Sequence, residues 1–211
     1  MLEALTSLLR TPDAQYDLRL ALVEAYTEEG REMDAGSQLV LASTVMPDDQ
    51  RAVADLEEAR VQLQPSLDVQ LTGLTLGNSL SLPGYNVRPA SLEAGDTVSI
   101  TLWWETKTRM ETDYTAFIHI LGPDGQMLAQ GDRLLRSGNR PTSRWRVGEV
   151  LRDEFQLVIP PAAQPGEYVV TAGVYYWKTG ERLPVSDAEG LRVSDDTITL
   201  GAITVAPPEV G

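Results

Sequence analysis

The chain has 211 residues, which is enough for one large domain or two small ones. Its 31 acidic and 17 basic residues give a formal net charge of −14. We expect no nucleic acid as a partner, because that binding needs clustered Lys and Arg. Cysteine is absent and the single histidine is His119, which excludes disulfides, zinc–thiolate sites and two-histidine metal sites. We therefore expect no cofactor and no bound metal.

No stretch of the chain has the roughly 20 consecutive apolar residues of a membrane-spanning helix. The longest apolar runs are of strand length, and the first residues carry an acid where a signal peptide carries bases. The sequence therefore predicts no membrane insertion and no export signal in this chain.

The amino-acid composition changes at Pro65, which predicts an α+β, multidomain chain with domains over residues 1–64 and 65–211. Before Pro65, Ala, Leu, Glu and Arg dominate at helical spacing. This spacing predicts helices over residues 2–10, 13–30, 33–45 and 49–63. Pro12 is expected in a first helical turn, Leu18 on an apolar helix face, and Asp48 as the cap of the last helix.

The helical segment resembles one tetratricopeptide repeat, a 34-residue helix–turn–helix unit. The residues that fall in the register of this family are Leu22, Tyr26, Gly30, Ala35, Leu39, Ala42 and Pro47. The resemblance implies a short helical hairpin with a concave groove for a protein segment. The alternative is a generic three-helix connector.

After Pro65, alternating apolar residues and regular turns predict an all-β antiparallel sandwich of immunoglobulin-like or jelly-roll type. We expect strands over residues 67–76, 97–104, 114–121, 126–130, 151–159, 167–177, 182–185 and 197–205. The turn at residues 122–125, with the sequence Gly-Pro-Asp-Gly, predicts a hairpin. In the strand over 97–104, alternation places Val98, Ile100, Leu102 and Trp104 on the inner face and Trp103 on the outer face.

A family resemblance covers residues 92–205. It is carried by short motifs that include Leu102-Trp-Trp, Asp113-Tyr-Thr-Ala-Phe-Ile-His-Ile-Leu, Pro141-Thr-Ser-Arg-Trp-Arg and Pro165-Gly-Glu-Tyr. These resemble a β-sandwich appended to large bacterial membrane glycosyltransferases and related envelope proteins. The layout is also similar to the sandwich that recognises O-antigen at the end of a polysaccharide ABC transporter. The resemblance implies an accessory module that is extracytoplasmic or at the cell surface, although Arg140 stands where the family commonly has an aromatic residue.

No arrangement of residues points to catalysis. Sequence spacing does not pair the carboxylates of Glu105, Glu111, Glu149 and Asp153 for acid–base chemistry. His119 has no acid beside it in sequence, so we expect a structural histidine rather than a base. We therefore do not expect an enzyme.

The segment from residue 133 to 152 is unusually basic. It contains Arg133, Arg136, Arg140, Arg144, Arg146 and Arg152 against one acid, Glu149. Trp145 lies among them. Because arginines bind carboxylates and stack on rings, the pattern predicts a docking loop for an acidic partner or a glycan. The alternative is that Trp145 plugs one end of the sandwich while the arginines solvate a long loop.

Three aromatic residues are candidates for a second exposed surface: Trp103, Tyr175 and Trp177. Flat exposed rings are typical of sites that bind sugars or protein partners. The alternative for Trp103 is that it lies beneath the linker or the helices.

The sequence as a whole predicts a non-catalytic binding and assembly protein of the bacterial cell envelope or extracellular space. The helical half has a net charge of −8 and the strand half −6 despite its basic loop. Head-to-tail attraction between copies would then build a filament. The expected partner is thus a protein segment or a second copy. The alternatives are a carbohydrate-binding accessory module of surface-glycan synthesis and a fragment of an enzyme whose catalytic half lies elsewhere.

Overall fold

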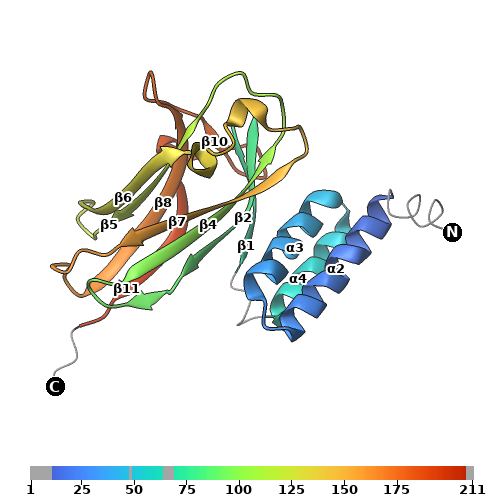
Figure 1. Cartoon of the computed structure of the whole chain (residues 1–211), viewed down its shortest axis with the longest axis horizontal. Helices are drawn as coiled ribbons and strands as arrows, with labels where there is room; N and C mark the ends of the chain where they lie inside the picture. Colours follow the sequence, from blue (N-terminus) through green and yellow to red (C-terminus); the bar gives the residue numbers. More distant parts are fainter. Residues whose placement is uncertain (1–10, 48, 64–68, 208–211) are drawn as a thin grey trace. The chain divides into compact units, whose positions relative to one another are not determined.

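A computed structural model describes residues 11–47, 49–63 and 69–207 (Figure 1). The chain divides into two compact units, Met1–Leu71 and Thr72–Gly211. The predicted division between residues 64 and 65 falls outside the described residues, as do the predicted helix over residues 2–10 and Asp48. No helix in the described part of the chain is both long and apolar enough to cross a membrane.

The described part of the first unit contains three helices, α2 (Pro12–Glu28), α3 (Glu32–Val45) and α4 (Gln50–Leu63), within a residue or two of their predicted positions. Thr11 caps α2 by accepting a hydrogen bond from the N–H of Ala14, and Pro12 occupies the first turn, where no N–H is needed. Gly30 has a φ of +70°, which allows the tight turn into α3. Asp49 caps α4 through the N–H of Ala52.

The helices pack on a small apolar core made of Tyr16, Val23, Ala35, Leu39, Ala42, Ala52 and Leu56. The expected apolar face of α2 was partly wrong, because Leu18 is 43% exposed and Tyr16 is buried instead. The hydroxyl of Tyr16 donates to the carbonyl of Ala52, so this ring ties α2 to α4. Three described helices are too few to support the tetratricopeptide assignment, which stays a prediction.

The second unit is a sandwich of two β-sheets (Figure 1). One sheet has the order β10-β1-β2-β4-β7, formed by β10 (Val185–Ser186), β1 (Gln70–Leu76), β2 (Leu80–Arg88), β4 (Thr97–Thr106) and β7 (Val150–Val158). The other has the order β3-β11-β8-β5-β6, formed by β3 (Ser91–Leu92), β11 (Ile198–Val205), β8 (Gly166–Tyr176), β5 (Thr115–Leu121) and β6 (Met127–Leu134). The short strand β9 (Glu181–Arg182) pairs with the end of β8.

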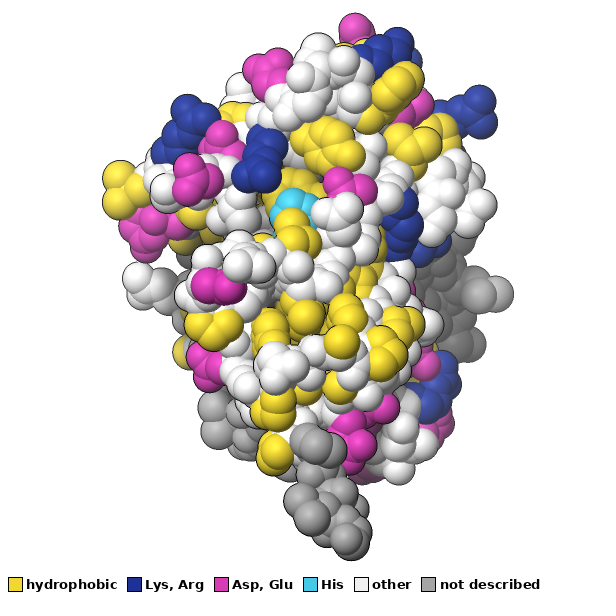
Figure 2. All heavy atoms as spheres, turned by 90° about the vertical axis from the view of Figure 1, so that its left-hand side faces the viewer, with side chains coloured by type: hydrophobic (Ala, Val, Ile, Leu, Met, Phe, Trp, Pro, Cys, Tyr) yellow, Lys and Arg dark blue, Asp and Glu magenta, His cyan; other side chains and the backbone are white. Residues whose placement is uncertain are grey.

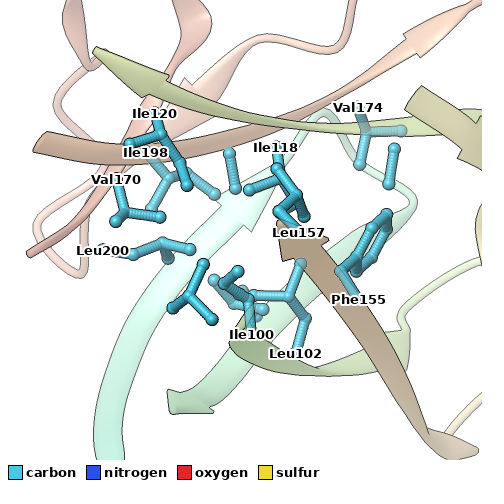
Figure 3. Packing of buried hydrophobic residues seen from close by; sticks show 14 of the residues in the cluster. Ile100, Leu102, Ile118, Ile120, Phe155, Leu157, Val170, Val174, Ile198 and Leu200 are labelled. Carbon is cyan, nitrogen blue, oxygen red and sulfur yellow. The ribbon is translucent and has the colours of Figure 1, made fainter. Parts of the chain in front are cut away.

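The sandwich core lies between the facing sheets (Figure 3). One sheet contributes Ile118, Ile120, Val170, Val174, Ile198 and Leu200, and the other contributes Ile100, Leu102, Phe155 and Leu157. The predicted inner face of β4 is confirmed, since its four inner residues are fully buried. Burial of each large aliphatic side chain contributes roughly 1.5–3 kcal/mol, which is what holds the two sheets together.

Several parts of the sandwich differ from the sequence prediction. The strand expected over residues 182–185 is split into β9 and β10, which lie in different sheets, and β3 was not predicted. β2 was missed altogether, because Pro83, Gly84 and Asn86 resemble turn residues. A register shift between Ser81 and Gly84 lets this strand pair with β4 in spite of the proline. β6 extends to Leu134, so Arg133 lies on a strand rather than in the predicted loop. Two short 3₁₀ turns, Leu135–Gly138 and Thr142–Arg144, then lead toward β7.

Candidate functional site

Five side chains with binding chemistry gather on the outer face of the β3-β11-β8-β5-β6 sheet, and we call them the outer-face cluster. They are Phe117 and His119 of β5, Asp132 of β6, Tyr175 of β8 and Arg182 of β9. Alternation places them there, because the residues between them on β5 and β8 point into the core. Figure 2 shows the histidine at the surface of this side, among hydrophobic, acidic and basic side chains.

Phe117 forms an aromatic floor for the cluster. Its ring is only 2% exposed and lies directly over Gly173, where a Cβ would come within 2.3 Å of the ring. The guanidinium carbon of Arg182 lies 4.6 Å from the centre of the ring, and the centre of the His119 imidazole lies 4.6 Å from the same point. Gly173 is therefore required by this close packing, and the floor is held rigidly.

Hydrogen bonds within the protein hold the polar groups that surround the ring of Phe117. The hydroxyl of Tyr175 donates to Asp132 at 3.1 Å, and Nε2 of His119 lies 3.7 Å from the other carboxylate oxygen of Asp132. Nη1 of Arg182 donates to the carbonyl of Asp195 and to the hydroxyl of Thr197, each at 2.8 Å. These contacts orient the polar groups without burying them, since Asp132 and Arg182 are exposed residues.

The surroundings of the two titratable rings of the cluster, His119 and Tyr175, favour their uncharged forms. Burial lowers the pKa of His119, and Arg182 adds to this effect while Asp132 opposes it. Burial, followed by the hydrogen bond to Asp132, raises the pKa of Tyr175. The cluster thus combines a carboxylate acceptor, a phenol, a neutral imidazole and a guanidinium around a ring. In the described residues no group of three His, Asp or Glu side chains is placed to hold a metal ion.

The basic segment over residues 133–152 is organised differently from the docking loop that its sequence predicted. Nη1 of Arg133 lies 2.9 Å from a carboxylate oxygen of Asp153, whose side chain is 3% exposed, and its guanidinium stacks on Phe155. The backbone N–H of Arg136 donates to the second oxygen of Asp153 at 2.9 Å. The side chains of Arg133 and Arg136 also donate to the carbonyls of Glu154 and Arg152 in β7. These arginines therefore fasten the segment to β7.

Two more arginines of this segment form ion pairs within the sandwich. Both terminal nitrogens of Arg140 donate to the carboxylate of Glu149, with Nη2 lying 2.7 Å from Oε2. Arg152 forms an ion pair with Glu154 at 2.8 Å. Burial works against ionisation of Glu149, but the N–H of Arg146 and the guanidinium of Arg140 outweigh it and lower the pKa of Glu149. The side chains of Arg144 and Arg146 are exposed, so only a small part of the predicted basic surface remains available.

The three candidate tryptophans have different environments. Trp145 is 3% exposed, belongs to the sandwich core, and donates its Nε1–H to the carbonyl of Arg140 at 2.8 Å, as its predicted role as a plug requires. The expectation that Trp103 is exposed is wrong, because its side chain is 2% exposed. Trp177 is 58% exposed, with the ammonium of Lys178 at 5.5 Å from its ring. Of the three, only Trp177 offers an open ring.

One member of the outer-face cluster, Tyr175, was a binding candidate from the sequence; the way the others assemble was not predicted. The missed signal lies in the β5–β6 hairpin, whose register pairs Phe117 with Asp132 and His119 with Gln130. A register shift between Ile120 and Leu121 sets this pairing, so counting back from the turn alone would have placed Asp132 opposite the inward-facing Ala116.

Comparisons with known proteins give only distant similarities. No family model and no curated protein matches the chain. Among solved structures, the C-terminal domain of Wzt is similar at 16% identity and a TM-score of 0.43, over 65% of this chain and 87% of that one. The CARDB domain of a Pyrococcus furiosus protein in complex with di-metal ions matches at 12% identity and 0.34, over 65% and 90%.

A third similar structure is a calcium-binding mutant of beta-glucuronidase 2 from Bacteroides uniformis, at 17% identity and a TM-score of 0.36. The match covers 55% of this chain but only 14% of that enzyme. Similarity at these TM-scores carries no argument about function, and the sandwich is established by the strand pairing itself.

Proposed function

We propose that this chain is a non-catalytic binding module, that the outer-face cluster recognises a carbohydrate, and that it works in a bacterial envelope or extracellular setting. The observation that supports the proposal is the convergence of Phe117, His119, Asp132, Tyr175 and Arg182 on one sheet face. Asp132, Tyr175 and Arg182 are held by hydrogen bonds within the protein and remain at least partly exposed, as a preorganised binding surface requires.

The chemistry of the cluster matches a sugar better than an ion or an apolar ligand. A sugar presents hydroxyl groups that both donate and accept hydrogen bonds, and Asp132, His119 and Arg182 supply the complementary acceptors and donors. The opposite charges of Asp132 and Arg182 balance, which suits a neutral polyhydroxylated ligand. Rigid aromatic side chains such as Tyr175 supply contact area at low entropic cost.

A glycan array followed by titration calorimetry tests this proposal. Asp132→Ala removes a charged acceptor and is expected to weaken binding by more than tenfold, since such hydrogen bonds contribute about 1.5–3 kcal/mol. Tyr175→Phe removes one hydroxyl and is expected to weaken binding by about threefold to tenfold. Thr204→Ala is the matched control, because Thr204 is exposed on the same sheet but lies toward the other end of β11.

Two results would contradict the carbohydrate proposal. One is the absence of saturable binding to any glycan on a broad array. The other is an equal loss of affinity in Asp132→Ala and Thr204→Ala, because that would separate binding from the cluster.

Protein assembly is the second candidate function, and a groove of about 300 Å³ in the helical unit favours it. Four acids line this groove: Asp13, Asp17, Asp49 and Asp55. A basic segment of a partner, or the exposed Arg144 and Arg146 of a second copy, would complement them. Light scattering in low and high salt tests this candidate, and a monomer under both conditions would remove the filament hypothesis.

A further inference from the structure

A second groove lies on the open side of the sandwich, between β6 and β7. β7 is an edge strand of one sheet and β6 is an edge strand of the other, so in the described strand order each has a neighbouring strand on one side only. The groove measures about 250 Å³ and is lined by residues 129–133 of β6 and 154–158 of β7. It is therefore walled by two continuous stretches of edge strand.

The direction of the β7 backbone can be deduced from two independent observations. The N–H of Ile159 donates to the carbonyl of Asp96, and the carbonyl of Ile159 accepts from Gly95, so residue 159 faces the β4 side. Because backbone groups alternate along an antiparallel strand, the even-numbered residues of β7 face the groove. The arginine contacts agree, since the carbonyls that they reach belong to Arg152 and Glu154.

The groove-facing edge of β7 has a covered half and an open half. Arg133 and Arg136 occupy the carbonyls of residues 154 and 152, which is how proteins commonly protect an edge strand. No such cover is found in the described structure at Gln156 and Val158, whose N–H and C=O groups face the groove. Such a row of free donors and acceptors is a template for one more strand.

We propose that this open half binds an extended, basic peptide segment of a partner protein by strand addition to β7 at Gln156 and Val158. The charge at the rim favours a basic partner: Asp132 is an exposed acid, whereas Arg133 is neutralised by Asp153 and Glu154 by Arg152. The side chain of Val158 is 60% exposed and offers an apolar contact for an alternate residue of the segment. The segment therefore alternates basic residues with β-branched ones.

Fluorescence anisotropy with a labelled nine-residue peptide that alternates Lys with Val and Thr tests this site. Gln156→Pro is expected to weaken binding at least tenfold, because proline removes a groove-facing N–H and its ring blocks the edge. The β4–β7 ladder is spared, since the N–H of residue 156 does not face β4. Gln156→Ala is the matched control; it keeps the backbone donor and is expected to stay within about twofold to threefold of the unchanged protein.

A second probe removes any dependence on how well the proline variant folds. Two versions of the same peptide are made, one N-methylated at its odd positions and one at its even positions. The version whose methyl groups block the amides that face β7 is expected to bind at least tenfold more weakly. The other version is expected to bind as well as the unmodified peptide. A peptide with Glu in place of Lys is expected not to bind.

Several results would overturn the strand-addition site. They are no binding of the basic peptide at 1 mM, equal losses in Gln156→Pro and Gln156→Ala, or equal binding of the acidic peptide. A self-association of the unchanged protein that Gln156→Pro abolishes would replace the peptide by a second copy. Glycan binding measured on Gln156→Pro separates this site from the outer-face cluster, because Gln156 is not a member of that cluster, although Asp132 takes part in both.

Discussion

Two regions of the sandwich contain the same kinds of side chain and use them differently. The basic segment over residues 133–152 and the outer-face cluster both combine arginine, a carboxylate and an aromatic ring. Where the basic segment packs on β7, the side chain of Asp153 and the residue Trp145 are each 3% exposed, and both are satisfied by contacts within the protein. In the outer-face cluster the carboxylate of Asp132 has a side chain that is 35% exposed. Of these two carboxylates, only that of Asp132 stays open to solvent.

The difference follows from the backbone. The segment between β6 and β7 has little regular strand structure of its own, so its polar groups must find partners elsewhere. Arginine supplies several donors from one side chain, and here it reaches carbonyls on the edge of β7 that has no neighbour in the described strand order. The outer-face cluster stands on a regular sheet whose backbone is already paired, so its side chains remain available. A dense run of charge in a sequence therefore does not by itself predict a free surface.

The largest expected effect that separates the two regions comes from Asp153→Ala. Removing this buried carboxylate leaves the guanidinium of Arg133 and the N–H of Arg136 without their partner. Removing one partner of a buried charge pair costs about 3–5 kcal/mol. We therefore expect the free energy of unfolding, measured with urea, to fall by that amount. Glu154→Gln, at the exposed neighbour, is expected to change stability by about 0.5 kcal/mol or less. Unchanged stability in Asp153→Ala would show that the segment does not depend on this clamp.

A smaller effect is expected from Trp145→Phe. The substitution removes the Nε1–H that bonds the carbonyl of Arg140 and leaves a small void in the core, at a cost of about 1–2 kcal/mol. Thermal unfolding measures this cost, and glycan binding is expected to stay unchanged. A loss of glycan affinity with an unchanged melting temperature would instead make Trp145 a ligand contact and remove the distinction between the two regions.

The fold was predictable from the sequence where periodicity and turns agree. β4, β5, β7 and β8 all lie close to their predicted ranges, since each has a clear period of two. β2 was not predictable in this way, because Pro83 is tolerated only through a shift in register that depends on the neighbouring strand. Trp103 shows the same limit: alternation correctly placed it opposite the inner residues of β4, but alternation says nothing about what covers that face.

The outer-face cluster was less predictable, because its members come from four strands. His119 was interpreted as structural for lack of an acid nearby in sequence, yet Asp132 lies beside it on the next strand. Arg182 enters through β9, a strand of two residues that has no periodicity to detect. The charges of the basic segment are close in sequence, but the groups that pair with Arg133 and Arg136 lie on β7 and could not be identified from that closeness.

The smallest expected effect is the contribution of His119 to the pH dependence of stability. It tests whether the imidazole of the outer-face cluster is partly buried against the sheet. Burial lowers the pKa of His119 in the folded protein below the 6.5 of the unfolded chain. Between these two pKa values the unfolded chain binds more protons, so stability falls as the pH drops through 6.5 and this loss is complete below the folded pKa. We expect the free energy of unfolding to fall less between pH 7.5 and pH 5.0 in His119→Gln than in the unchanged protein.

The neighbours of His119 supply the control. Asp132 opposes the shift and Arg182 supports it, so Asp132→Asn is expected to steepen the loss of stability toward low pH, and Arg182→Gln to reduce it. The free energy of unfolding is measured with urea at both pH values for the unchanged protein and the three variants. Each variant's change between the two pH values is then compared with that of the unchanged protein, which cancels the titration of the many surface acids. Identical pH dependence in all four would show that the imidazole is solvated like an isolated histidine. The cluster would then lack the preorganisation that distinguishes it from the rest of the surface.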